Sequence, residues 1–113
     1  MQTTNDLDLG IEAVLRSLRI DGTYKGYRYL VYGIRLVVQD PRRTELITKD
    51  VYPDIARTFK STVFRVERNI RFAIASCWPY SNEALDQMAG YHLAKRPTNR
   101  QFIDIVAFFV RSH

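Results

Sequence analysis

Residues 51–78 read VYPDIARTFKSTVFRVERNIRFAIASCW, a short amphipathic segment, a polar turn and a longer amphipathic segment. In the second segment, apolar residues recur at three- and four-residue steps, which places them on one stripe of a helix. This stripe consists of Val63, Val66, Ile70, Ala73 and Cys77. At 3.6 residues per turn, Arg68 falls opposite the stripe. The rest of the outward face consists of Phe64, Arg65, Arg71, Phe72 and Ala75, with Glu67 nearer its edge. The pattern predicts a basic and aromatic surface with one carboxylate.

The joint between the two segments predicts a helix, a turn and a second helix. Thr62 stands just before the periodic run, where its hydroxyl can accept a hydrogen bond from a free amide of the first turn. The preceding helix is expected to end near Lys60. Two amphipathic helices joined by one turn, the second with arginines from its first turn onward, are typical of a helix-turn-helix DNA reader. An ordinary helical hairpin with a solvated charged face gives the same pattern, because helix-turn-helix sequences carry no invariant residue.

Length and composition predict one all-α domain. The chain has 113 residues, of which 46% are apolar, enough for a core of its own. Periodicity predicts six helices: 6–19, 26–39, one that begins between 48 and 53, 62–78, 81–89, and a last one after the basic segment 95–99. Pro79 is expected to stop the fourth helix, and Gly90 to cap the fifth. The predicted organisation is a flexible leader, 1–5, and a helix-turn-helix domain, 6–113.

Charge and cysteine content indicate the compartment and the class of partner. Lysine and arginine outnumber aspartate and glutamate by 17 to 12, which favours polyanionic partners. The single Cys77 lies on the apolar stripe and is expected to be a buried, reduced thiol. No apolar run is long enough to cross a membrane, and the amino terminus is acidic rather than a signal sequence. We expect a cytoplasmic bacterial protein that is associated with the nucleoid when bound, without a membrane partner.

Three groups of basic residues lie outside the long helix. Lys95 and Arg96 precede the last helix, whose free amides beside two cations could hold a phosphate. Arg42 and Arg43 follow Pro41 in a loop, where a phosphate contact and a solvated surface are equally compatible with the sequence. The tyrosines beside the cations of 25–28 are interpreted as packing residues, since amphipathic tyrosines commonly seat a helix on its neighbours.

Motifs of enzymatic chemistry are missing from the sequence. It has no glycine-rich phosphate loop, no paired cysteines and no His-Glu-x-x-His, and only His92 and His113 supply imidazoles. These counts are too low for an ordinary zinc site. We therefore predict no catalytic residue, no metal, no cofactor and no enzymatic activity.

Beyond these patterns, the sequence resembles a known family. The blocks that carry the resemblance are Lys25-Gly26-Tyr27-x-Tyr29-Leu30, Ile47-Thr48-Lys49, Tyr52-Pro53-Asp54-Ile55-Ala56, Arg65-Val66-Glu67-Arg68-x-Ile70-Arg71-x-Ala73-Ile74, Trp78, Gly90-Tyr91, and Pro97-Thr98-Asn99-x-x-Phe102-Ile103. Their order and spacing are similar to those in the DNA-binding effector domain of the sporulation initiation response regulator, stage zero sporulation protein A. The blocks cover nearly the whole chain after the leader.

The resemblance implies a six-helix fold, a recognition helix starting near Thr62, and binding to short promoter boxes in double-stranded DNA, commonly as a head-to-tail pair. It implies that Arg68 reads a base, and two parallel donors would suit a guanine. Glu67 would accept from a cytosine amino group. Further contacts to a base edge or to phosphates are expected from Arg65, Arg71, Ser61 and Thr62, and phosphate contacts from Lys95 and Arg96.

Some residues depart from the family pattern. Phe64 stands where the family usually has a small polar residue, and Phe72 where it has a histidine. Each could meet a thymine methyl in an altered target box or cover a neighbouring helix. The region Pro79–Ala89, which in the family touches the RNA polymerase sigma factor, also differs. The chain has no room for the receiver domain of the family, so, if Met1 is the natural start, we expect a stand-alone effector.

Two other functions are compatible with the sequence. The exposed aromatics and the missing receiver are also expected of a protein-interaction module that modulates another transcription regulator without reading DNA. Charge and tyrosine content alone are compatible with nonspecific RNA binding. Sequence-specific binding to duplex DNA remains the leading hypothesis.

Overall fold

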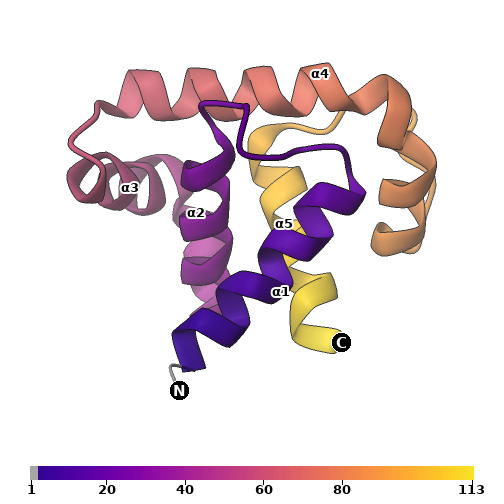
Figure 1. The fold of residues 1–113 in the computed structure, drawn as a ribbon, viewed down its shortest axis with the longest axis horizontal. Helices are drawn as coiled ribbons and strands as arrows, with labels where there is room; N and C mark the ends of the chain where they lie inside the picture. The colour runs from indigo at the N-terminus through magenta and orange to yellow at the C-terminus, as the bar shows by residue number, and fades with distance from the viewer. Residues whose placement is uncertain (1–2) are drawn as a thin grey trace.

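The computed structural model describes residues 3–113, which are all-α, without a strand (Figure 1). The five α-helices are α1 (Thr3–Ser17), α2 (Tyr27–Gln39), α3 (Tyr52–Thr58), α4 (Val63–Ala89) and α5 (Asn99–Ser112). Between α2 and α3 the chain forms a 3₁₀ helix, η1 (Pro41–Leu46), and a π-helical turn, η2 (Ile47–Val51). Met1 and Gln2, at the start of the predicted leader, lie outside the described residues. Figure 1 shows α4 lying across one end of the bundle of α1, α2 and α5.

The predicted break at Pro79 is wrong, and with it the count of six helices. α4 continues through Pro79 to Ala89, so the segment predicted as a fifth helix is the last part of α4. Proline removes one amide from a helix and pushes against the preceding turn, which bends a helix without always ending it. The Ser81 hydroxyl donates to the Cys77 carbonyl at 3.0 Å, a bond that also favours bending. Because Ser81 and Leu85 are buried after the bend, packing holds this part of α4 in helical form.

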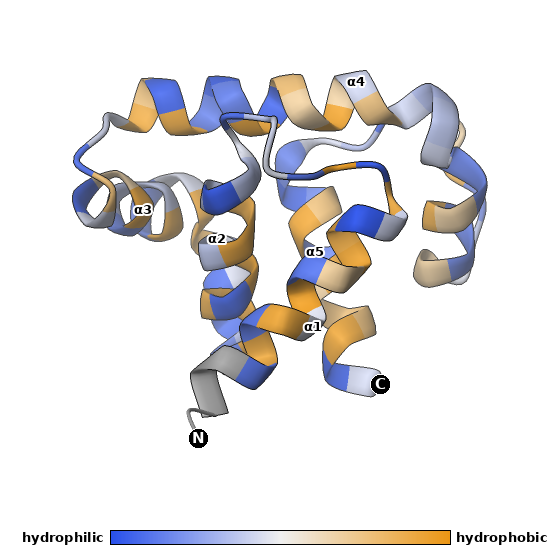
Figure 2. Ribbon diagram, viewed as in Figure 1, coloured by the Kyte–Doolittle hydropathy of each residue, from blue (hydrophilic) through white to orange (hydrophobic). Residues whose placement is uncertain are grey.

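The core forms where the apolar stripes of the helices meet. Figure 2 shows that each turn of α2, α4 and α5 contains both apolar and hydrophilic residues, as expected of amphipathic helices. The buried apolar residues include Ile11, Leu15, Leu18, Leu30, Ile34, Ile47, Val51, Ile55, Val66, Ile70, Ala73, Cys77, Phe102, Ile103 and Val106, so most of the apolar stripe predicted for residues 63–77 is buried. Val63 is an exception, because it is the first residue of α4 and is 38% exposed. The buried stripe of α4 therefore begins at Val66, one turn later than predicted.

Two sets of contacts fix α4 against the other helices. The Asn99 amide nitrogen, at the start of α5, donates to the Tyr52 hydroxyl at 3.0 Å and to the Glu67 carbonyl at 3.1 Å. Gly26, just before α2, lies so close to α4 that a Cβ added there would be 2.4 Å from the Asn69 carbonyl oxygen. The first half of α4 is thus held on both flanks. No helix among residues 3–113 combines the length and the apolar character needed to span a bilayer.

Candidate nucleic-acid interface

A short turn joins α3 to α4 and sets the direction of the long helix. The Phe59 amide closes α3 by donating to the Ile55 carbonyl at 3.0 Å, and the Ser61 amide donates to the Ala56 carbonyl at 2.8 Å. Between them Lys60 adopts a left-handed backbone with φ of 53°. The Thr62 hydroxyl accepts a hydrogen bond from the Arg65 amide at 3.1 Å, which confirms its predicted role as the N-cap. The structure thus joins the short helix α3 to the long helix α4 by a tight turn within residues 52–78.

The outward face of α4 displays arginines and aromatic rings. Arg65 and Arg68 are exposed, and Phe64 and Phe72 are 67% and 64% exposed. The Arg68 guanidinium carbon lies 6.0 Å from the centre of the Phe64 ring, within reach of a cation–π attraction. Phe72 lies beside Tyr24, from the segment between α1 and α2, with their ring centres 6.3 Å apart. Phe72 therefore meets a neighbouring segment, whereas Phe64 contacts a side chain of its own helix.

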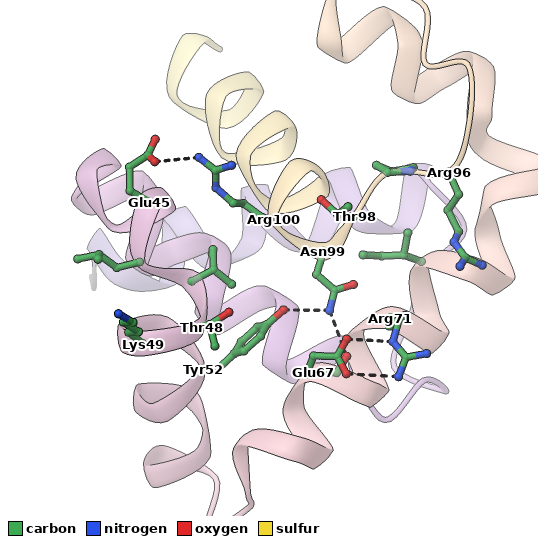
Figure 3. A pocket seen from close by; sticks show the side chains of 14 residues that line it. Glu45, Thr48, Lys49, Tyr52, Glu67, Arg71, Arg96, Thr98, Asn99 and Arg100 are labelled. Atoms are coloured by element: carbon green, nitrogen blue, oxygen red, sulfur yellow. Dashed lines mark hydrogen bonds and ion pairs between the residues drawn. The ribbon is translucent and has the colours of Figure 1, made fainter.

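Glu67 occupies a different position from the two predicted base-reading arginines. Its carboxylate receives two hydrogen bonds from Arg71, at 2.9 and 3.3 Å (Figure 3). Hydrogen bonding to this carboxylate raises the pKa of the Arg71 guanidinium. The pair lies on the flank of α4 that faces α3 and α5. Of the three residues predicted to read bases, Arg65 and Arg68 lie together on the outward face of α4, and Glu67 lies on the flank of the helix.

A cleft of about 650 Å³ lies beside this Glu67–Arg71 pair. Figure 3 shows residues from η1, η2, α4 and the start of α5 around it, among them Lys49, Tyr52, Arg96 and Arg100. Arg100 is neutralised by Glu45 at 3.0 Å. Arg96 lines the cleft, and Lys95 is exposed in the segment before it. The cleft is thus a predominantly basic hollow next to the outward face of α4.

The start of α5, predicted as a phosphate site, is already capped by its own side chains. The Thr98 hydroxyl accepts from the Gln101 amide at 3.1 Å, and the Gln101 side chain accepts from the Thr98 amide at 2.9 Å. This capping box satisfies two of the amides that the sequence suggested for a phosphate. The cations at 95 and 96 remain beside the helix start.

Two further groups from the sequence prediction have defined positions. The Ser61 hydroxyl oxygen is buried and has no hydrogen-bond partner within residues 3–113. Arg42 pairs with Asp40 at 3.0 Å. Arg43 bridges Asp50 and Asp54, at 2.7 and 2.9 Å, and so connects η1 to α3. The two loop arginines, for which the sequence allowed either a phosphate contact or a solvated surface, therefore form ion pairs with carboxylates of the same domain.

Lys25 and Arg28 lie near the outward face of α4, a position that the sequence did not predict. Both line a hollow beside Arg65 and Arg68. The neighbouring tyrosines are at least partly buried, as interpreted from the sequence. The sequence shows that cations stand next to these tyrosines. Their position beside α4 depends on the close approach of Gly26 to that helix, which the sequence does not show.

In the part of the chain that the structure describes, no three histidine, cysteine, aspartate or glutamate side chains are grouped to hold a metal ion. The interface described above is built from cations, aromatic rings and amides.

Comparison with protein families agrees with this geometry. The family model described as "Sporulation initiation factor Spo0A C terminal" matches residues 11–109, most of the chain. The matched range contains α2, α3 and α4 and all the basic residues of the interface. This family is a non-enzymatic DNA-binding domain. The chain therefore belongs to the Spo0A C-terminal family, the DNA-binding effector domain of a sporulation regulator.

Proposed function

We propose that this domain is a sequence-specific transcription regulator of double-stranded DNA, and that residues 62–78 of α4 form the recognition helix in the major groove. The observation that carries the proposal is the outward face of α4, where Arg65 and Arg68 are exposed on a helix whose opposite stripe is buried. A helix held in this way fits the width of the major groove with its arginines toward the base edges. The family match supports the same conclusion.

Arg68 is proposed as the principal base-reading residue. It lies at the centre of the outward face, and a guanidinium can donate two parallel hydrogen bonds to O6 and N7 of a guanine. Arg65, one turn earlier, would contact a base edge or a phosphate. Glu67 is proposed to accept from a cytosine amino group at the edge of the contact, with its partner Arg71 fixing the direction of the carboxylate.

Residues around the recognition helix are proposed to set its position on the duplex. Lys95 and Arg96 lie on the flank of α4 where Arg71 also lies, and would contact one phosphate strand. Thr62 and Ser61 would act through the start of α4 rather than as free hydroxyls, because the first is engaged as a cap and the second is buried. These residues would fix the register without reading sequence.

Phe64 and Phe72 are proposed to alter the preferred DNA box. An exposed aromatic ring in the major groove can contact the methyl group of a thymine. Phe64 is better placed for this role, since Phe72 is partly engaged with Tyr24. We expect a variant with serine at position 64 to select a different box from the wild-type protein.

Selection of binding sites from random duplex DNA tests the proposal. The wild-type protein should enrich one motif, and Arg68→Ala should lose about 1–3 kcal/mol of binding and relax the preference at one base pair. Phe108→Ser is a matched control for the Phe64 variant, because it removes an exposed ring from α5. Equal affinity of the wild-type protein for selected and scrambled duplexes would overturn the sequence-reading proposal.

A second candidate function is a protein-interaction module that modulates another regulator. The exposed rings of Phe64 and Phe72 favour it, since large apolar groups on an open face are common at protein interfaces. The partners suggested by the resemblance are the polymerase sigma factor, near residues 79–89, and a second copy bound head to tail on DNA. A complex that forms without DNA and protects Arg68 from solvent would favour this function over DNA reading.

A further inference from the structure

A second groove runs along α4 on the flank opposite the Glu67–Arg71 pair. Its volume is about 600 Å³. Lys25 and Arg28, before and within the first turn of α2, form one wall, and Arg65 and Arg68 of α4 form the other. The remaining lining residues are Tyr29, Phe59 and Asn69, so no carboxylate faces the groove.

Within residues 3–113, the four cations of this groove are unpaired, whereas two of the four cations in the cleft on the other flank are paired with carboxylates. In the cleft beside Glu67, both Arg71 and Arg100 are paired with carboxylates. Several like charges around one hollow repel one another, and a bound anion relieves the repulsion. The groove therefore favours a negatively charged ligand.

The wall formed by Lys25 and Arg28 is held at a fixed distance from α4. Gly26, between them, packs against the Asn69 carbonyl with no space for a side chain. On the floor of the groove, the Tyr29 and Phe59 rings meet edge to face with their centres 5.5 Å apart. Lys25 also lines a neighbouring hollow with Arg68 and Phe72. In Figure 1 the segment between α1 and α2 reaches the level of α4.

We propose that Lys25 and Arg28 bind a backbone phosphate of the duplex whose bases α4 reads, and that they act as positioning residues for this recognition helix. The proposal rests on the proposed function. A helix in the major groove is flanked by both sugar-phosphate strands. Arg96 shares a hollow with Lys25 at the outward face of α4, and the groove extends this cationic surface to Arg28. A phosphate held there fixes the position of α4 on the duplex without reading sequence.

Charge-neutralising variants test the assignment. We expect Lys25→Gln and Arg28→Gln each to weaken binding about 3- to 10-fold, equally for the selected and scrambled duplexes, and to lower the log-log salt slope by about one. The matched control is Arg111→Gln, which removes the same charge from the last turn of α5, at the end of the bundle away from α4 (Figure 1). Thermal unfolding checks that the exposed variants fold as the wild-type protein does.

Single neutral methylphosphonates along the selected duplex locate the contact. One position should weaken wild-type binding and have little effect on Arg28→Gln. Losses in the two groove variants no larger than in Arg111→Gln would overturn the inference while leaving sequence reading intact. A changed base preference in these variants would also overturn it, because it would assign the cations to bases. A wild-type protein without preference for the selected duplex would instead overturn the proposed function.

Discussion

At the scale of single residues, Asp54 joins three elements through its carboxylate. It receives hydrogen bonds from Arg43 at 2.9 Å and from the Tyr32 hydroxyl at 2.9 Å, and its side chain is 19% exposed. Burial alone would raise the pKa of Asp54, but the bonds from Arg43 and Tyr32 outweigh burial and hold it below the ordinary 3.8. A carboxyl with a lowered pKa stabilises the fold above its unfolded pKa, and this stability is lost as pH falls through the folded pKa.

We therefore predict that Asp54→Asn destabilises the domain by about 1–3 kcal/mol near neutral pH, the usual range for hydrogen bonds to a charged group. As the pH falls from about 3.8 through the lower pKa of folded Asp54, the difference from wild type should shrink, because the wild-type carboxyl becomes protonated. Urea unfolding across this pH range measures both effects. Asp104→Asn, at an exposed position of α5, serves as the control. A constant difference at every pH would contradict the prediction.

Gly26 determines how closely α2 approaches α4. Its φ of −78° is accessible to any residue, so the requirement for glycine here is one of space. An added Cβ would meet the Asn69 carbonyl oxygen at 2.4 Å and its carbon at 2.8 Å, both backbone atoms that cannot rotate away. We predict that Gly26→Ala destabilises the domain by about 1–3 kcal/mol, as overpacking does.

The control for this prediction is Gly10→Ala in α1, where an added Cβ meets nothing within 4 Å. Since alanine favours a helix over glycine, that variant should gain about 0.5–1 kcal/mol. Thermal unfolding of both variants separates the two effects. If Gly26→Ala unfolds at the same temperature as wild type, α4 and α2 are not held as closely as the structure indicates.

At the scale of elements, the turn between α3 and α4 depends on Lys60 in a left-handed conformation, with φ of 53°. This conformation costs an ordinary residue about 1–2 kcal/mol, more than the entropy that glycine adds to the unfolded chain. We predict that Lys60→Gly stabilises the domain by up to about 1 kcal/mol, and that Lys60→Val destabilises it. Denaturant unfolding of the pair gives the comparison, and a valine variant as stable as the glycine variant would contradict it.

The start of α4 and the glycine cap at Gly90 could be predicted from the sequence because they depend on neighbouring residues, although the cap was assigned to a separate helix, 81–89. Thr62 caps α4 through the amide three residues on, and Gly90 ends it with φ of 82°. The break at Pro79 was predicted by the same local reasoning and is wrong, because the buried Ser81 and Leu85 hold the helix together beyond it. The turns η1 and η2 were also not predicted, since their ion pairs join residues as far apart as Arg43 and Asp54.

At the scale of the whole molecule, helical periodicity predicted the exposed arginines of α4 but not their surroundings. Periodicity fixes the direction of Arg65 and Arg68 relative to the buried stripe. It cannot show that Glu67 is engaged by Arg71 rather than free, nor that Lys25 stands across a groove from α4. The second fact depends on packing between segments more than forty positions apart, such as Gly26 against Asn69. Predictions of individual DNA contacts from the sequence were therefore less complete than the prediction of the helix itself.

The distribution of charge over the molecule leads to the last prediction. Several cations on or beside α4 have no ion pair in the described structure, among them Lys25, Arg28, Arg65, Lys95 and Arg96, in addition to the proposed base-reading Arg68. If each of these five releases one counterion from a phosphate, log K should fall with log salt with a slope of roughly −4 to −5. Arg100 should contribute less, because Glu45 already neutralises it at 3.0 Å and its side chain also donates to the Thr44 carbonyl.

Arg96→Gln should therefore reduce the slope by about one, whereas Arg100→Gln should leave it nearly unchanged although both remove one positive charge. Affinities for one selected duplex at several salt concentrations give the two slopes. Both arginines line the same cleft, so the comparison separates the effect of ion pairing from that of location. Equal reductions would mean that Glu45 releases Arg100 to the DNA. The DNA-binding surface would then include paired cations such as Arg100 as well as the unpaired ones.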